Sequence, residues 1–152
     1  MDLSLVELPN FCQITERIGT SGQPTRAQFH AIAAAGYATV INLAMHDSDD
    51  AIPREGSIVA SLGMNYVHLP VPFDAPGRAH LQRFCRVMDA LEQERVFVHC
   101  QVNARVSAFM YQYLTLTKGV SAAQATSPLL RKWLPTMNPE WRAIMALTRE
   151  DL

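Results

Sequence analysis

Short runs of apolar, β-branched residues alternate along this chain with longer segments of helical periodicity. Each run predicts a buried strand, and the apolar residues that follow it recur at helical spacing. Parallel strands need a long crossover connection, which a helix between successive strands supplies. The alternation therefore predicts an α/β domain, with a mainly parallel central sheet of about four to five strands flanked by helices. Strands are expected near residues 13–19, 38–44, 65–71 and 95–99, and helices near 26–35, 53–62, 81–91 and from the last strand to about 118.

The size and charge of the chain narrow its class. A length of 152 residues suits one domain with a sizeable core, so residues 1–152 are expected to form a single domain. A net charge of −1 favours neither nucleic acid nor membrane as a partner. The N-terminus has no signal-peptide pattern, and the longest nearly uncharged stretch, residues 31–45, is too short to cross a bilayer. Three cysteines without a CxxC pair indicate a reduced, cytoplasmic protein, whose oligomeric state stays open.

The segment VFVHCQVNAR, residues 96–105, places a cysteine at the end of a strand and an arginine at the start of the next helix. Ligands of parallel sheets bind beyond the carboxyl ends of the strands, where Cys100 falls. A helix N-terminus and a nearby cation both favour the nucleophilic thiolate. The amides of residues 101–104 favour an anion, and Arg105 can clamp two oxygens of a phosphate. The pattern thus indicates in-line attack of sulfur on phosphorus, through a cysteinyl-phosphate.

The same segment also fits a purely structural interpretation. Cys100 would then be a core residue that ends a strand, and Arg105 a solvated side chain in the first helical turn. Loop amides that point apart, with Arg105 aimed at bulk water and the sulfur enclosed, would support this second interpretation.

Three parts of the sequence resemble known phosphatases. His99-Cys100 and Arg105, with the apolar helix after them, resemble the dual-specificity signature of cysteine-dependent phosphatases, which reads HC, five residues, R, then Ser or Thr. GTSGQPTRAQFHAIAAAGYATVINLA resembles a bacterial phosphatase-like family that begins with SGQPT, also seen as the β-lactamase-hydrolase-like domain, and NYVHLPVPFDAP matches that family's next strand and loop. The resemblance covers about residues 11–145. It implies the phosphatase α/β fold and phosphomonoester hydrolysis, of the tyrosine or dual-specificity type, on a phosphorylated protein or small molecule.

The resemblance also implies a role for each site residue, without metal or cofactor. Cys100 is the expected nucleophile, Arg105 the phosphate clamp and Asp74 the general acid that protonates the leaving alcohol. Ser107 is expected to hydrogen-bond the thiolate and to assist release of the phosphocysteine, and His99 to orient the loop. The residues expected to bind the substrate phosphate are Gln101, Val102, Asn103, Ala104 and Arg105.

Several of these residues have structural alternatives. Asp74 also fits the N-cap of the helix that contains Leu81. His99 also fits a hydrogen-bonded core histidine, and Ser107 an ordinary small helix residue. The turn at residues 21–23 is expected either to pack beside the site or to serve only as a turn and helix cap. The polar residues His46, Asp47, Asp49 and Asp50 match no metal motif and are expected to form a solvated loop.

The chain departs from the phosphatase signature in its loop length, because four residues rather than five separate Cys100 from Arg105. Aligned on Cys100, Asn103 replaces the loop glycine, and Ser107 keeps the hydroxyl position. Aligned on Arg105, the loop has lost one residue and the hydroxyl is displaced by one. We prefer the second alignment, because one deletion explains both Arg105 and Tyr113-Leu114, which then match a common YL pair.

The shortened loop leaves three functions open. Fewer amides and a smaller radius predict altered or weak hydrolysis, because placement errors of about 1 Å cost on the order of 100-fold in rate. A catalytically impaired module that only binds phosphate or another oxyanion is the first alternative. The second is a rhodanese-like sulfurtransferase, which uses a six-residue cysteine loop to carry a persulfide on the residue equivalent to Cys100.

Overall fold

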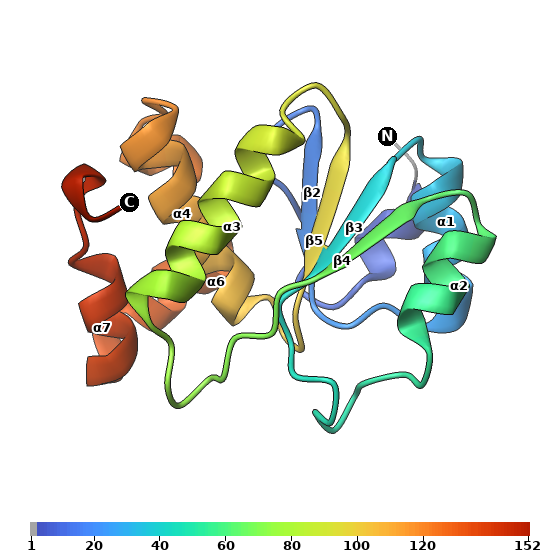
Figure 1. Ribbon diagram of the computed structural model, residues 1–152, viewed down its shortest axis with the longest axis horizontal. Coiled ribbons are helices and arrows are strands. Elements are labelled where there is room, and N and C mark those ends of the chain that lie inside the picture. Colours follow the sequence, from blue (N-terminus) through green and yellow to red (C-terminus); the bar gives the residue numbers. More distant parts are fainter. Residues whose placement is uncertain (1–2) are drawn as a thin grey trace.

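The computed structural model describes residues 3–152 and contains a five-stranded sheet with helices on both sides (Figure 1). The strand order is β1-β2-β5-β3-β4. The strands are parallel except β1, which pairs antiparallel with β2. This arrangement confirms the predicted α/β fold. The strands are β1 (Cys12–Gln13), β2 (Ile18–Ser21), β3 (Thr39–Asn42), β4 (Asn65–His68) and β5 (Val96–His99).

The first predicted strand, residues 13–19, is instead a hairpin. The chain turns between β1 and β2, and the Ile14 and Thr15 amides both donate to the carbonyl of Ile18. The sequence did not mark this turn, because the polar residues 15–17 make the reversal without glycine or proline. The other three predicted strands are confirmed, as β3, β4 and β5.

Helices connect the strands and continue after the last one. Thr25 begins α1 with the predicted capping box, in which its hydroxyl accepts from the Gln28 amide. The α-helices are α1 (Arg26–Ala34), α2 (Glu55–Ser61), α3 (Arg78–Ala90), α4 (Ala104–Thr117), α5 (Ala122–Ala125), α6 (Pro128–Trp133) and α7 (Pro139–Met145). The 3-10 helices are η1 (Leu3–Glu7), η2 (Leu134–Thr136) and η3 (Arg149–Asp151). Within the described residues, no helix is long and apolar enough to cross a membrane.

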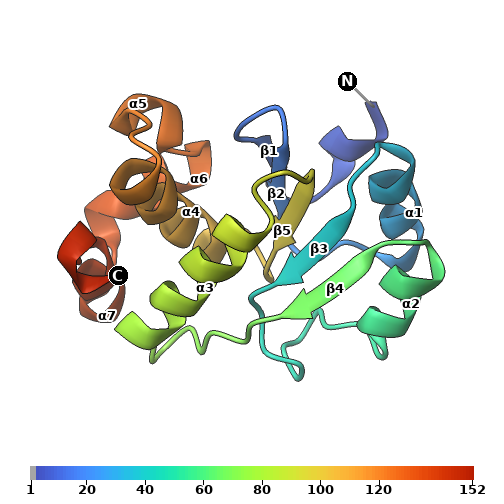
Figure 2. The same cartoon turned by 45° about the horizontal axis from the view of Figure 1, so that its top comes forward.

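Two apolar clusters flank the sheet. Helices α1 and α2 cover one face, and α3, α4 and the C-terminal helices cover the other (Figures 1 and 2). Successive strand residues point to opposite faces. Val98 and Cys100 accordingly belong to the α3/α4 cluster, whereas Phe97 belongs to the α1/α2 cluster. His99 also faces α1, where its ring meets Phe29 at 5.9 Å between centroids. The two residues of the His-Cys pair are therefore buried on opposite faces.

Candidate active site

The loop between β5 and α4, residues 100–103, turns the chain sharply beyond the carboxyl end of the sheet. Asn103 makes the turn in the left-handed conformation, with φ 76° and ψ 9°, and α4 begins at the next residue. Asparagine tolerates this conformation better than most residues that carry a Cβ. Its side-chain amide donates to the carbonyl of Asn10 at 2.8 Å and to the hydroxyl of Thr20 at 3.2 Å. These bonds hold Asn103 in place at the base of the helix.

Three successive carbonyls of this loop are bound from outside it. His99 Nδ1 lies 3.1 Å from the carbonyl oxygen of Cys100, the Gln23 amide donates to that of Gln101 at 2.9 Å, and Asn10 Nδ2 donates to that of Val102 at 2.8 Å. Every described peptide bond here is trans, so each carbonyl points opposite to the N–H of the same peptide unit. Because these three carbonyls point toward the residues that bind them, the N–H groups of residues 101–103 point away from those residues.

The amides of this loop are left without protein acceptors. In the part of the chain that the structure describes, the N–H groups of residues 101–106 donate no hydrogen bond to a carbonyl or side chain. The last of them belong to the first turn of α4, where helical amides have no intrahelical partner. Consecutive unpaired amides at the start of a 14-residue helix favour an anion.

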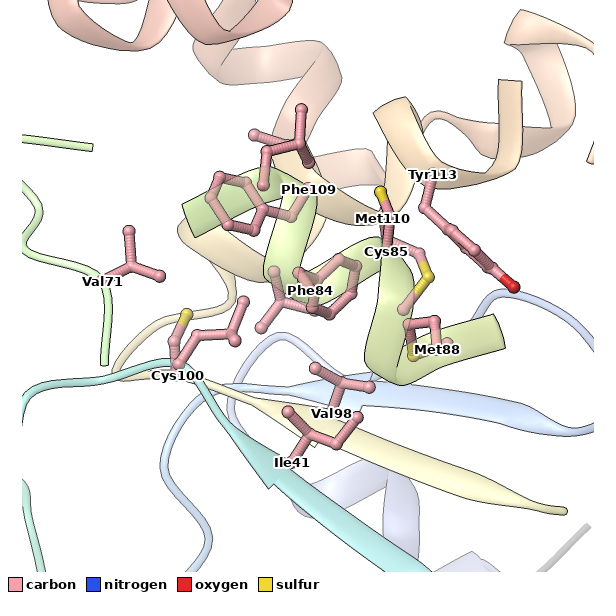
Figure 3. Packing of buried hydrophobic residues seen from close by; sticks show 14 of the residues in the cluster. Ile41, Val71, Phe84, Cys85, Met88, Val98, Cys100, Phe109, Met110 and Tyr113 are labelled. Atoms are coloured by element: carbon pink, nitrogen blue, oxygen red, sulfur yellow. The ribbon is translucent and has the colours of Figure 1, made fainter. Parts of the chain in front are cut away.

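Cys100 lies at the floor of this loop. Its side chain is fully buried, and it belongs to the apolar cluster beneath α3 and α4. Figure 3 shows its sulfur on the α3 side of the sheet, with Val71 and Phe84 nearby. In this conformation the thiol is enclosed, as the structural interpretation of the sequence expects. Attack on a substrate therefore requires the wall around the sulfur to move.

Arg105 is not solvated. Only 5% of its surface is exposed, and its guanidinium donates to the carbonyl of Val71 at 2.9 Å. The same guanidinium lies 5.8 Å from the centre of the Phe73 ring. The predicted alternative of an arginine aimed at bulk water is therefore wrong. The side chain joins α4 to the segment after β4, which carries the predicted acid.

Asp74 lies on that segment, in an exposed turn with Phe73. Phe73 anchors this turn by two kinds of contact. Its ring packs against Trp133 and Trp141, and its carbonyl accepts a hydrogen bond from Trp141 Nε1 at 2.7 Å. The alternative role of Asp74 as a helix cap is wrong, because Gly77 is the N-cap of α3. The carboxylate is exposed, three residues after the Val71 carbonyl that Arg105 binds.

A buried polar cluster supports the loop from the α1/α2 side. His99 Nε2 lies 2.6 Å from Glu55 Oε2, and Gln23 Nε2 donates to Glu55 Oε1 at 2.7 Å. Both ring nitrogens of His99 thus lie within hydrogen-bond distance of an oxygen, so the buried imidazole has a polar partner on each side. Burial alone raises the pKa of Glu55, but the hydrogen bonds and charge of His99, with Gln23 and Tyr66, outweigh it and lower the pKa overall.

The SGQPT segment packs directly beside the loop, as one of its two interpretations expected. A Cβ at Gly22 would lie 2.6 Å from the carbonyl oxygen of Gln101, so only glycine allows this approach. The next residue, Gln23, supplies both the amide that holds Gln101 and the side chain that holds Glu55. The segment is therefore a support for the loop as well as the entry to α1.

An open groove of about 420 Å³ lies against the outer side of the loop. Phe73 and Val102, two of the most exposed large apolar side chains of the described residues, stand on its walls with 42% and 47% of their surface exposed. Its full lining is Asn10, Phe73, Val102, Ala104, Pro128, Leu129, Lys132 and Trp133. The groove is mostly apolar, and Lys132 is its one cation.

The comparisons with known proteins agree with this geometry. Residues 12–139 match the family model described as a DSP-PTPase phosphatase fused to NAD+ kinase. This chain belongs to the DSP-PTPase phosphatase family. It is also 34% identical to a protein of the DUF442 group from Shewanella putrefaciens CN-32, provisionally named a phosphatase. The two structures superpose with a TM-score of 0.84 over 93% of this chain and 92% of the other.

Other proteins share parts of the sequence or only the fold. β-Lactamase hydrolase-like proteins of Agrobacterium fabrum and Xylella fastidiosa are 30% and 32% identical over 61% and 60% of this chain. The chain spans 22% of the length of these curated relatives. Tk-PTP in its active form shares the fold at 21% identity, with a TM-score of 0.75 over 95% of this chain and 99% of that one. TpbA of P. aeruginosa, solved with phosphotyrosine, shares it at 16% identity and a TM-score of 0.71, over 93% and 86%.

The loop of this chain keeps the left-handed turn of the DSP-PTPase signature, but with a residue other than glycine. Asn103 stands three residues after Cys100, where the signature has glycine, and adopts the left-handed conformation that glycine would. This finding favours the alignment on Cys100 over the preferred alignment on Arg105. Ser107 then holds the hydroxyl position. Its hydroxyl donates to Asn103 Oδ1 at 3.3 Å and accepts from Ser127 at 2.7 Å, so it contacts the turn of the loop rather than the sulfur.

The family signature does not reveal every residue that shapes this site. Glu55 and Asn10 contact the His-Cys pair and the loop, yet neither stands in a recognisable motif. Glu55 is one of the 14 acidic residues of the chain, and it begins a short helix far from Cys100 in sequence. The sequence contains one indirect indication of Glu55. His99 ends a buried strand, and a buried imidazole needs a polar partner.

Proposed function

We propose that residues 1–152 form one phosphatase-like domain that hydrolyses phosphomonoesters through a cysteinyl-phosphate. The observation that carries the proposal is the loop at residues 100–105. The carbonyls of Cys100, Gln101 and Val102 are bound by residues outside the loop, and the amides of the loop are unpaired. The loop begins with a buried cysteine and ends with a buried arginine. The family membership of the chain supports a phosphatase in general.

The phosphate dianion is bound by backbone amides of the loop and by the guanidinium of Arg105. The unpaired amides of residues 101–106 and the N-terminus of α4 bind its oxygens. Arg105 exchanges the carbonyl of Val71 for two phosphate oxygens, since a charged bidentate pair is stronger than a single bond to a neutral carbonyl. The exchange frees the segment above Cys100 and opens the wall around the sulfur.

The chemistry then proceeds in two displacements. The Cys100 thiolate attacks phosphorus, an S–P bond forms, and the P–O bond to the leaving alcohol breaks while Asp74 donates its proton to that oxygen. A water molecule next attacks phosphorus and gives its proton to the Asp74 carboxylate. The S–P bond breaks, inorganic phosphate leaves and the thiolate is restored. Ser107 assists this release through the turn at Asn103, which it holds.

The leaving group of the substrate lies in the groove beside the loop. Phe73, Val102 and Trp133 offer an apolar lining suited to an aromatic or otherwise apolar alcohol. The phosphotyrosine bound to TpbA, which shares this fold, supports an aryl phosphate as the first substrate to test. A protein phosphotyrosine and a small aryl phosphate present the same group to such a groove.

A phosphate-binding module without turnover is the second candidate. Complete burial of Cys100 and the bond from Arg105 to Val71 favour it, because both oppose attack on a bound phosphate. The same features predict slow hydrolysis if the loop does open. The sulfurtransferase alternative rests only on the six-residue loop, and the family to which the chain belongs argues against it.

Turnover by the purified wild-type chain tests the proposal. We expect release of phosphate from p-nitrophenyl phosphate and from phosphotyrosine, and slower release from glycerol phosphate, which lacks an apolar leaving group. Binding of inorganic phosphate without turnover of any ester would replace hydrolysis by the binding module. Transfer of sulfur from thiosulfate to cyanide, without ester hydrolysis, would establish the sulfurtransferase.

Removal of the proposed acid is expected to affect esters unequally. Asp74→Asn should lower kcat for phosphotyrosine by about 10²-fold or more, the usual contribution of a general acid. The loss should be smaller for p-nitrophenyl phosphate, because its leaving group needs little protonation. The measurement is kcat for both esters at the same pH.

The exposed position of Asp74 makes this test clean. Neither the native aspartate nor the asparagine that replaces it is buried in the core, so the unfolding temperature should not change. Asp47→Asn, in the exposed loop after β3, is the matched control and should leave both rates unchanged. Equal losses of rate on both esters would contradict a role for Asp74 in protonating the leaving group.

A further inference from the structure

The N-terminal segment at residues 9–11 crosses the outside of the phosphate-binding loop, which comprises residues 100–105. The carbonyl of Pro9 accepts from the Gly22 amide at 2.7 Å, and the ring of Phe11 stacks on Phe97 at 6.4 Å between centroids. Asn10, between these two anchors, has a left-handed backbone with φ 50°. Anchored on both sides, Asn10 presents its amide to a loop that lies more than ninety residues away in sequence.

Asn10 makes a reciprocal pair of bonds with the loop. Its side chain donates to the carbonyl of Val102 at 2.8 Å, and its own carbonyl accepts from Asn103 Nδ2 at 2.8 Å. The two bonds enclose the single peptide unit that joins Val102 to Asn103. The carbonyl of this unit points toward Asn10, so its N–H points away from Asn10.

We propose that Asn10 is a positioning residue that sets the direction of the backbone N–H of Asn103 for phosphate binding and transfer. The role rests on the proposed function, because it concerns the phosphate held by the same loop. His99 and Gln23 hold the two preceding carbonyls from within the fold. Asn10 holds the third, and it is the only one of the three whose side chain also lines the groove. Without its amide, the carbonyl of Val102 loses its partner, the Val102–Asn103 unit can tilt, and its N–H is a poorer ligand for phosphate.

Glycine is the substitution that isolates this bond. Asn10→Gly removes the amide that binds Val102, while the backbone carbonyl that accepts from Asn103 stays. Glycine adopts φ 50° without strain, so the path of the chain is preserved. Asn10→Asp is a second variant of nearly the same shape, with an acceptor in place of the donor. Asn65→Gly, at the exposed amino end of β4, is the matched control.

We expect the two Asn10 variants to weaken binding of inorganic phosphate by about 10-fold and to lower kcat/KM for p-nitrophenyl phosphate by about 10- to 100-fold, since small errors of placement are costly in catalysis. Part of the loss should appear in kcat, because a rotated amide is also misplaced in the transition state. Phosphate should shift the Asn103 amide resonance in the wild type and shift it much less in the variants. The Asn65 variant should behave as the wild type.

The outcomes separate this proposal from the hydrolysis proposal. If the wild type binds phosphate without hydrolysing any ester, and Asn10→Gly weakens that binding, the positioning role stands and hydrolysis fails. Wild-type phosphate affinity and kcat/KM in both Asn10 variants, measured below their unfolding temperatures, would overturn the positioning role, even with a lowered unfolding temperature. A wild-type chain that neither binds phosphate nor hydrolyses an ester would overturn both.

Discussion

Replacement of Cys100 by serine is expected to lower turnover of aryl phosphates by more than about 10³-fold, while phosphate is still bound. A serine hydroxyl at neutral pH is a far weaker nucleophile than a thiolate. The adjacent His99 cannot serve as its base, because the His99 ring is turned to the opposite face of the sheet and bound to Glu55. The amides of the loop and Arg105 are unchanged by the substitution, so the anion site remains. The measurements are kcat on p-nitrophenyl phosphate and the affinity for inorganic phosphate.

The matched control is the other cysteine of the same apolar cluster. Cys85, on α3, is also buried, and burial, with the nearby Asp89, raises its pKa to about 12. Cys85→Ser should therefore leave kcat within a few-fold of the wild type, even if it costs similar stability. Acid-quenched enzyme should carry phosphate on Cys100 and none on Cys85. Turnover by Cys100→Ser at the wild-type rate would exclude a cysteinyl-phosphate.

The fold was predictable from the sequence to the extent that it depends on local pattern. The strands β3, β4 and β5 follow from apolar runs, and α1 follows from the capping box at Thr25. The hairpin at β1 and β2 was missed because its turn contains neither glycine nor proline, the residues that usually mark a reversal. Cys100 and Arg105 were found because they follow an apolar strand and begin a helix, in a segment that resembles the phosphatase signature despite its shorter spacing.

The direction of each side chain was not predictable, since it depends on partners distant in sequence. Arg105 turns to Val71, and Asn10 reaches Val102, across intervals for which no local rule exists. The loop also shows that a signature can be kept in conformation rather than in residue type. Asn103 supplies the left-handed turn of the missing glycine, and its side chain adds bonds that glycine could not make.

Glu55 carries the largest expected effect on stability. Its carboxylate is 6% exposed and is bound by both His99 and Gln23. Glu55→Ala leaves the imidazole buried opposite an empty space, and removal of one partner of a buried pair costs about 3–5 kcal/mol. Urea unfolding should show this loss. Glu140→Ala, an exposed acid in the first turn of α7, is the control and should cost less than about 1 kcal/mol.

The pH dependence of unfolding separates the contribution of the Glu55 charge from that of packing. Because the folded state lowers the pKa of Glu55 below its ordinary value of 4.5, the ionised carboxylate contributes stability that is fully present above that pH. The contribution is lost as the pH falls below 4.5 through the lower folded-state pKa. Glu55→Gln keeps the shape and cannot ionise, so its free energy of unfolding should fall less steeply with acid than that of the wild type. Parallel curves for the two proteins below pH 4.5 would show that the charge of Glu55 does not stabilise the fold, and that His99 is held by packing alone.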